Sequence, residues 1–197
     1  MTLSSTTQHV LRDACLALHR ELDQKPVFAK LLSADLTLGE YRSGLGALHR
    51  GMTAVETAVK YQQASSLAGK VAPYEYRAPL LVQDLQALGI ECPRFALEPA
   101  LVPVSPGAYA GIRYVLEGAS LGSAHIGRHL QMHYPDLFAM APRYWQFQQE
   151  QAEGWPAFKL AISQLDQNLP QQANAIAAAL AAFRIFINQV DGNPDAA

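Results

Sequence analysis

Histidine is the residue type in this sequence with the clearest capacity for chemistry, and His19 has the most suggestive neighbours. Asp23 follows His19 by four residues, so on a helix the two side chains share one face, one turn apart. A carboxylate there can accept a hydrogen bond from Nδ1 of the imidazole, which fixes the tautomer and leaves Nε2 free to bind a metal. Arg12 lies on the same face and could meet an anionic group of the same ligand. An exposed histidine in a row of solvated charges is the alternative.

Three further histidines, His125, His129 and His133, stand four residues apart and would form a stripe along a helix. A pair of histidines at this spacing can chelate a divalent ion. The neighbouring sequence lacks the carboxylate of a catalytic zinc motif, and histidines near the C-terminus of a helix also suit the helix dipole. A partly exposed polar stripe is therefore the favoured interpretation.

Glycine marks a second candidate site. Gly111, Gly118 and Gly122 interrupt an otherwise helical stretch at spacings that return to one face. Each glycine costs a helix interior about 0.5–1 kcal/mol relative to alanine. We therefore expect something to approach the backbone closely on this face. A flat ligand and a tightly packed helix would both explain the pattern.

The surrounding sequence predicts helices joined by short connections, with no alternating strand pattern long enough to assign. Capping boxes at Ser5–Gln8 and Thr37–Glu40 begin the first two long helices, and Gly89 is placed to end the third. We expect a single all-α domain over residues 1–197, with frayed tails at 1–5 and 191–197. Pro26 either ends the first expected helix or opens a short one that contains Phe28 and Leu31-Leu32. The other expected helices are one from Thr37 to about Tyr61, Ala78–Leu88, the glycine-bearing helix to about His133, Ala141–Glu153, Pro156–Asn168 and Gln171–Gln189.

Composition narrows the class of protein. A chain of 197 residues, half of them hydrophobic, fits one domain with a full core. Its net charge of −2 argues against nucleic-acid binding. No apolar run is expected to span a membrane, and the N-terminus lacks the features of a signal peptide. Because Cys15 and Cys92 cannot make a disulfide framework or a thiolate metal site, a reduced cytoplasmic protein is the simplest interpretation.

Several segments resemble the heme oxygenase family, and their order and spacing match as well. The most specific one, Tyr114–Ser123, is similar to the distal helix of the bacterial branch that often accompanies phytochromes. The likeness runs from about Leu11 to Val190. Its other segments are Leu11–Ala14 with Leu18–Asp23 in the N-terminal helix, Leu36–Tyr41 at the start of the second long helix, and Tyr76-Arg77 with Leu81–Gly89. The resemblance implies a heme oxygenase-like helical bundle with a glycine-kinked distal helix.

The resemblance also implies roles for the two candidate sites. His19 matches the proximal histidine that ligates heme iron. Asp23 falls where many members place a glutamate that holds this imidazole, and its shorter side chain is expected to need a bridging water. Gly118 and Gly122 match distal glycines that let the backbone lie against the heme face.

Further matches concern the edge of the heme. Arg12 falls where a basic residue meets a propionate, and Lys159 lies in a stretch similar to one that supplies a second propionate-binding lysine. Tyr114 and Arg113 are also assigned to heme binding, with Arg113 as a group that could hold distal water. Ser163 stands where animal-type enzymes carry an arginine, which leaves the heme orientation open.

Two residues of the distal segment depart from the family pattern. Ala119 occupies the place of the aspartate that organises water in animal-type enzymes, although the phytochrome-linked branch generally lacks it. Ser123 replaces the second glycine of the usual pair, and its hydroxyl could crowd or hydrogen-bond to the distal site. Together with Gly118 and Gly122, these residues would form the wall that steers oxygen toward one meso carbon.

The resemblance favours a catalytic heme oxygenase, with heme as cofactor and substrate and with biliverdin, carbon monoxide and ferrous iron as products. It implies an electron donor of the ferredoxin or flavoprotein reductase type, and a bacterial phytochrome as a candidate recipient of the bilin. A non-catalytic heme-binding or sensing protein of the same fold stays open because of Ala119, Ser123 and Ser163. A thiaminase-like enzyme would need a pocket cysteine with carboxylates, which the sequence does not offer.

Overall fold

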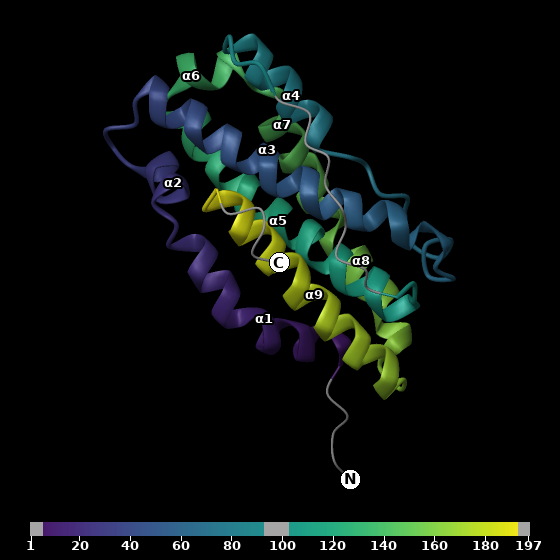
Figure 1. The fold of residues 1–197 in the computed structure, drawn as a ribbon. Helices are drawn as coiled ribbons and strands as arrows, with labels where there is room; N and C mark the ends of the chain where they lie inside the picture. Colours follow the sequence, from purple (N-terminus) through teal and green to yellow (C-terminus); the bar gives the residue numbers. More distant parts are fainter. Residues whose placement is uncertain (1–5, 93–102, 193–197) are drawn as a thin grey trace.

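A computed structural model describes residues 6–92 and 103–192, and within these ranges the chain forms helices and no strand (Figure 1). The all-α expectation is therefore confirmed. The elements are α1 Thr7–Asp23, α2 Pro26–Ala29, α3 Leu38–Tyr61, α4 Ala78–Ala87, α5 Pro106–His133, α6 Pro135–Met140, α7 Arg143–Gln151, α8 Trp155–Ile162 and α9 Leu169–Val190, with 3₁₀ turns at Lys30–Leu32, Gln62–Ala64, Ala152–Gly154 and Ser163–Leu165.

The helix ends follow from local chemistry. Thr37 and Glu40 form the predicted capping box, in which the Thr37 hydroxyl accepts from the backbone N–H of Glu40 and the Glu40 carboxylate accepts from that of Thr37. At the first helix the cap is Thr6, which accepts from the N–H of His9, rather than the box expected from Ser5. Gly89 follows α4 at φ 76°, a backbone conformation that favours glycine.

Two of the helices after α5 are shorter than the sequence indicates. The stretch expected over Ala141–Glu153 is α7 followed by a 3₁₀ turn, and the one expected over Pro156–Asn168 is α8 followed by another. Such tightened turns commonly end α-helices. Of the tails expected to fray, 1–5 and 191–197, residues 1–5 and 193–197 lie outside the described residues. Asp191 is held, because its backbone N–H caps α9 and its carboxylate pairs with Lys25 at 2.6 Å.

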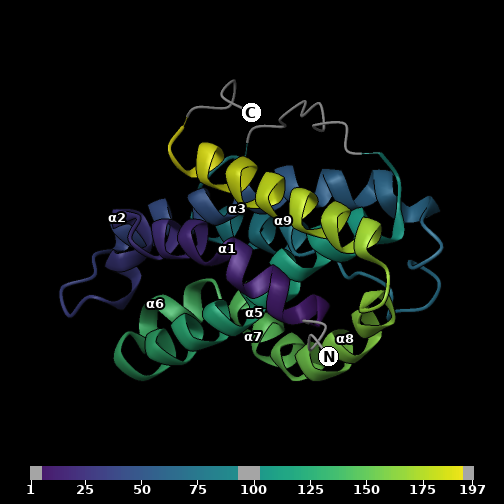
Figure 2. The ribbon, with the colours of Figure 1, turned by 90° about the horizontal axis from the view of Figure 1, so that it is seen from below.

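Helix α5 lies at the centre of the bundle, between α9 on one side and α7 on the other (Figure 2). Glycine lets α5 and α9 approach closely. A Cβ on Gly107 would overlap the backbone carbonyl of Gln171, and one on Gly111 would overlap the backbone carbonyl of Ala175. Because the obstructing atoms belong to the helix backbone, rotation of a side chain cannot relieve the overlap. Gly111 is therefore explained by helix packing.

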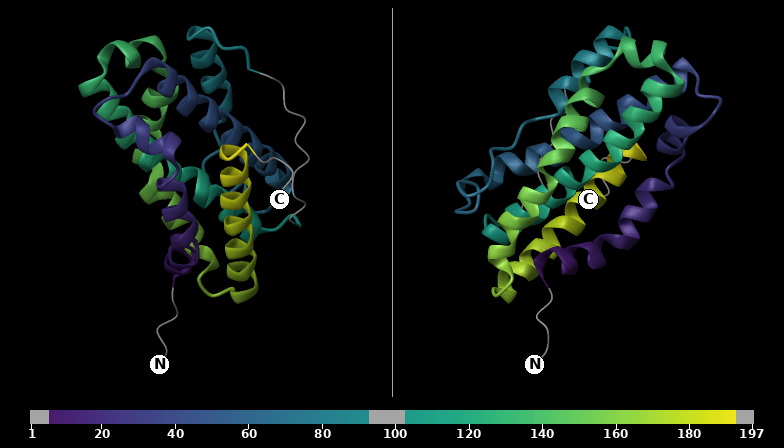
Figure 3. Two further views of the ribbon diagram at one scale, coloured as in Figure 1. Left: turned by 60° about the vertical axis from the view of Figure 1, so that its left-hand side comes forward. Right: turned by 180° about the vertical axis from the view of Figure 1, so that it is seen from behind.

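Helix α9 is long and apolar enough to cross a membrane by length and composition, contrary to the expectation that no apolar run would be. In the structure it packs against α1, α3 and α5, and Figure 3 shows it running beside α1. Its apolar character is accounted for by the core residues that it supplies, which are Ala175, Ala178, Ala179, Ala182, Phe183 and Phe186.

Helix α7 is anchored at its N-terminus by buried polar groups. The fully buried carboxylate of Asp84, on α4, accepts hydrogen bonds from the backbone N–H groups of Arg143 and Tyr144 at 3.2 and 2.8 Å. The hydroxyl of Tyr41, on α3, accepts from the Trp145 indole at 2.9 Å and donates to the carbonyl of Ala141 just before α7. These contacts fix α7 against α3 and α4, on the side of α5 away from α9.

Candidate functional site

The imidazole of His19 is held by its neighbours on α1 and α9. Nδ1 lies 2.9 Å from Oδ2 of Asp23, so the predicted contact forms directly, and the expectation of a bridging water is wrong. The edge of the ring meets Phe183 of α9, with ring centroids 6.1 Å apart. The His19 side chain is 60% exposed. An exposed pair of this kind contributes little to stability, so its clearest effect is to orient the ring and to leave Nε2 as the lone-pair nitrogen.

Gly118 and Gly122 lie in the middle of α5 and do not share the environment of Gly111. A Cβ on Gly118 would come within 3.8 Å of the Trp155 ring, which is ordinary van der Waals contact. A Cβ on Gly122 would have nothing within 4 Å. The protein packing therefore explains Gly111 and leaves the bare backbone at Gly122 unexplained.

Residues of α1 contribute to the electrostatic environment of Tyr114 on α5. Burial raises the pKa of the Tyr114 hydroxyl. Cys15 of α1 raises this pKa further, and Arg12 of α1 lowers it. Helix α8 packs against both α1 and α5. The two helices run in the same general direction, toward the end of the bundle that holds α2 and α6 (Figures 1 and 2).

The candidate residues are separated by similar distances along α1 and along α5. His19 comes seven residues after Arg12, and Gly122 comes eight residues after Tyr114, which are advances of about 10 and 12 Å at 1.5 Å per residue. Gly122 therefore lies about as far beyond Tyr114 along α5 as His19 lies beyond Arg12 along α1.

Partly exposed leucines lie near His19 on α1 and beside Gly122 on α5. Leu16, one turn before His19, is 44% exposed, and Leu121, beside Gly122, is 42% exposed. An imidazole nitrogen donor, a bare helix backbone and partly exposed leucines are groups that an apolar, metal-bearing ligand could use.

Helix α8 supplies an aromatic wall and a cation. Trp155 meets Tyr114 at a centroid distance of 5.4 Å and stacks on Phe158 at 5.9 Å. The ammonium of Lys159 lies 5.8 Å from the centroid of the Trp155 ring. Arg12 is exposed and pairs with its neighbour Asp13 at 3.0 Å. Neither cation is held in a buried ion pair, so both can turn toward an anionic group.

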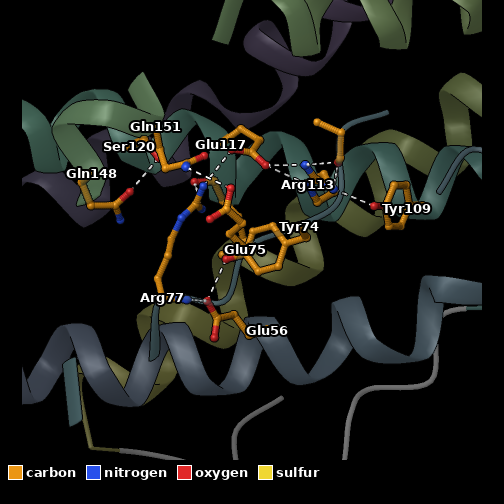
Figure 4. A network of polar contacts seen from close by, with 12 residues as sticks. Glu56, Tyr74, Glu75, Arg77, Tyr109, Arg113, Glu117, Ser120, Gln148 and Gln151 are labelled. Carbon is orange, nitrogen blue, oxygen red and sulfur yellow. Dashed lines mark hydrogen bonds and ion pairs between the residues drawn. The ribbon is translucent and has the colours of Figure 1, made fainter. Parts of the chain in front are cut away.

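Arg113 is not part of this site, which corrects the expectation that it binds heme or distal water. Its guanidinium is buried and forms an ion pair with Glu117 at 2.7 Å. It also donates to the Tyr109 hydroxyl at 2.6 Å and to the carbonyl of Ala72 at 3.2 Å. Figure 4 shows these contacts gathered on one side of α5. Arg113 and Gly118 stand about 140° apart at 100° per residue, so the guanidinium cannot reach the glycine face.

The contacts of Arg113 belong to a buried polar network that sequence reasoning missed. Glu117 also pairs with Arg77 at 2.8 Å, and Arg77 donates to the carbonyl of Leu116 at 2.6 Å. The carboxylate of Glu56 accepts from the Tyr74 hydroxyl at 2.8 Å and from the backbone N–H of Arg77 (Figure 4). Burial raises the pKa of Glu56. Arg77 and Arg113 hold Glu117 of α5, and Glu56 of α3 in turn holds the backbone of Arg77. Only the Tyr76-Arg77 motif pointed to this network in the sequence.

Ser123 and Ala119 also lie differently from what the resemblance implies. The Ser123 hydroxyl is buried and lies 2.9 Å from the hydroxyl of Tyr144 on α7. It therefore points into the protein and does not crowd the glycine face, which corrects that expectation. Ala119 is partly buried and packs against the core.

The histidine stripe shows a close pair without a third ligand. The rings of His129 and His133 lie 4.6 Å apart between centroids. Partial burial lowers the pKa of His129, and His133 and His125 add to this. Within the part of the chain that the structure describes, no three histidine, cysteine or acidic side chains are placed to hold a metal ion together.

Comparisons with known proteins agree on one family. The family model for heme oxygenase matches residues 5–191. A heme oxygenase from Xanthomonas campestris pv. campestris is 36% identical over 121 residues, which cover 61% of this chain and 71% of that protein. The fold matches the heme oxygenase of Neisseria meningitidis, solved with NO and CO bound, with a TM-score of 0.68 and 21% identity over 98% of this chain and 94% of that one. The chain therefore belongs to the heme oxygenase family, whose members bind and degrade heme.

Proposed function

We propose that this protein is a heme oxygenase that forms biliverdin, and that heme lies between α1 and α5 with His19 as its iron ligand. The proposal is carried by one pairing of features. Asp23 holds Nδ1 of the His19 imidazole on α1, and Gly122 leaves the backbone of α5 bare at a similar advance along a helix that runs in the same direction.

The residues present fit heme. His19 offers an imidazole nitrogen donor of the kind that holds heme iron. The open space at Gly122 admits the flat face of a macrocycle against the helix backbone, and Leu16 and Leu121 offer it apolar surface. The two propionates need cations. Arg12 lies on the same face of α1 as His19, and Lys159 lies beside the aromatic wall of α8.

Heme, when bound, supplies the iron that activates O₂ and is itself the ring that is opened to biliverdin, carbon monoxide and ferrous iron. The protein residues bind, orient and exclude water. Asp23 accepts the Nδ1 hydrogen bond of His19, which makes Nε2 a better donor. Ala119 offers no carboxylate and Arg113 is turned away, so backbone carbonyls of the glycine segment are the groups left to hold a proton-donating water.

A non-catalytic heme-binding protein is the second candidate, and the structure weakens one of its arguments. The Ser123 hydroxyl, which could have crowded the distal side, is hydrogen-bonded to Tyr144 instead. The absence of a carboxylate at Ala119 and of an arginine at Ser163 is what keeps this candidate open.

Reconstitution with hemin tests the proposal. With a reductant and O₂, the Soret band should decay and a biliverdin spectrum should appear, with the isomer identified by chromatography. His19→Ala should lose turnover while keeping its fold. His9→Ala is the matched control, because His9 is another exposed histidine of α1 and should leave turnover unchanged. A stable ferrous complex that never yields a bilin would support the second candidate.

The electron donor and the recipient of the product rest on the family resemblance. We propose a ferredoxin or a flavoprotein reductase as the donor, and a bacterial phytochrome as the recipient, because Tyr114–Ser123 is similar to the branch that accompanies phytochromes. Bilin transfer to an apophytochrome, followed by its red absorbance, tests the second of these partners.

A further inference from the structure

The glycine segment of α5 is backed by a row of polar side chains on its buried side. Glu117, Ser120 and Ser123 are spaced by three residues and bracket Gly118 and Gly122. All three are buried. Each is tied to a different neighbour, so the back of this segment is fixed at three successive levels.

Helix α7 provides two of these ties. The Ser120 hydroxyl donates to the side-chain carbonyl of Gln148 at 2.7 Å, and the hydroxyls of Ser123 and Tyr144 lie 2.9 Å apart. The Tyr144 side chain is fully buried, and its backbone N–H is bound to the carboxylate of Asp84. Tyr144 therefore connects the glycine segment to a part of the molecule that is itself anchored.

We propose that Ser123 and Tyr144 are a positioning pair that holds the glycine segment at a fixed distance from the heme face. This rests on the proposed function, because it assumes that heme lies against that segment. Glycines make a helix easier to deform, and the side of α5 at Gly122 has no protein neighbour to restrain it. The restraint must therefore come from the back, where a hydroxyl at position 123 makes a bond that a glycine there could not.

The positioning pair predicts a measurable change before any heme is added. Ser123→Ala and Tyr144→Phe each remove one hydroxyl and leave the packing nearly unchanged. In the apo-protein, amide hydrogen exchange over residues 118–123 should rise about 2- to 12-fold in either variant, which is the loss of one hydrogen bond. Tyr134→Phe is the control, because it removes the contacts of another tyrosine hydroxyl with Ser33 and Leu36 and should leave this segment unchanged.

The hemin complex gives a second readout that loss of stability alone would not move. In the ferrous carbonyl complex, the C–O stretching frequency should shift in both single variants. The shift in the double variant should be smaller than the sum of the two single shifts, because both substitutions break the Ser123–Tyr144 contact.

Unchanged exchange at 118–123 in both variants, or additive shifts in the double variant, would overturn the pair. Failure to bind heme would instead contradict the proposed function, and the exchange experiment on the apo-protein would still decide the pair.

Discussion

Alanine at Gly122 and alanine at Gly111 should have opposite effects, although both glycines belong to the same helix. A methyl group at Gly122 enters open space in the apo-protein. It should therefore stabilise the fold by about 0.5–1 kcal/mol, the helix propensity gained over glycine. For a chain of this size, that is a rise in Tm of about 1–4 °C.

A methyl group at Gly111 overlaps the backbone carbonyl of Ala175 on α9. Because α9 must move to accommodate it, we expect a loss of about 1–3 kcal/mol, typical of an overpacked core. Urea or thermal unfolding of the two apo-proteins measures both effects.

The two variants should also differ in their affinity for hemin, and here Gly122→Ala should be the more affected. The Gly122 methyl group would stand between the macrocycle and the helix backbone. If the same overpacking cost of about 1–3 kcal/mol applies to the complex, the Kd for hemin rises about 5- to 150-fold. Gly111→Ala should bind hemin normally to the extent that it is folded. An apo-protein destabilised by Gly122→Ala, or hemin affinity unchanged in that variant, would refute the assignment of Gly122 to the ligand face.

Three further outcomes are expected. Asp23→Asn should change the free energy of unfolding by no more than about 0.5 kcal/mol, because the His19–Asp23 pair is exposed. It should weaken the iron–histidine bond, which lowers the Fe–N stretching frequency of the ferrous complex. An unchanged frequency would contradict the role of Asp23. Glu117→Gln should lower the free energy of unfolding, measured in urea, by about 3–5 kcal/mol, because it leaves two buried guanidinium groups without their carboxylate. A loss below about 1 kcal/mol would mean that this network does not stabilise the position of α5. Burial raises the pKa of the Cys15 thiol to about 11, so at pH 8 iodoacetamide should label Cys15 only after unfolding. The corresponding contribution to stability is present below the unfolded pKa and is lost as pH rises through the window from about 9 to 11.

Spacing along one helix was enough to predict the His19–Asp23 contact, because both residues belong to α1 and positions four apart share a face. The capping box at Thr37 and the glycine stop at Gly89 were predictable for the same reason. Only the need for a bridging water was wrong, since the carboxylate reaches the imidazole directly.

Contacts between helices were the part that sequence could not supply. Gly111 and Gly122 have the same pattern in the sequence, yet one faces the backbone of α9 and the other faces open space. The direction of Arg113 depends on the carbonyl of Ala72 and on Arg77, which shares Glu117 with it, and that of Ser123 depends on Tyr144 of α7. Each of these outcomes is decided by a neighbour far away in the sequence or by the rotation of α5 about its axis.

A crystal structure of the hemin complex tests the central claim most directly. The account predicts iron bonded to Nε2 of His19, with the opposite face of the ring against the backbone at Gly118 and Gly122. Iron bonded to His125, His129 or His133, or a ring bound away from the space between α1 and α5, would contradict it.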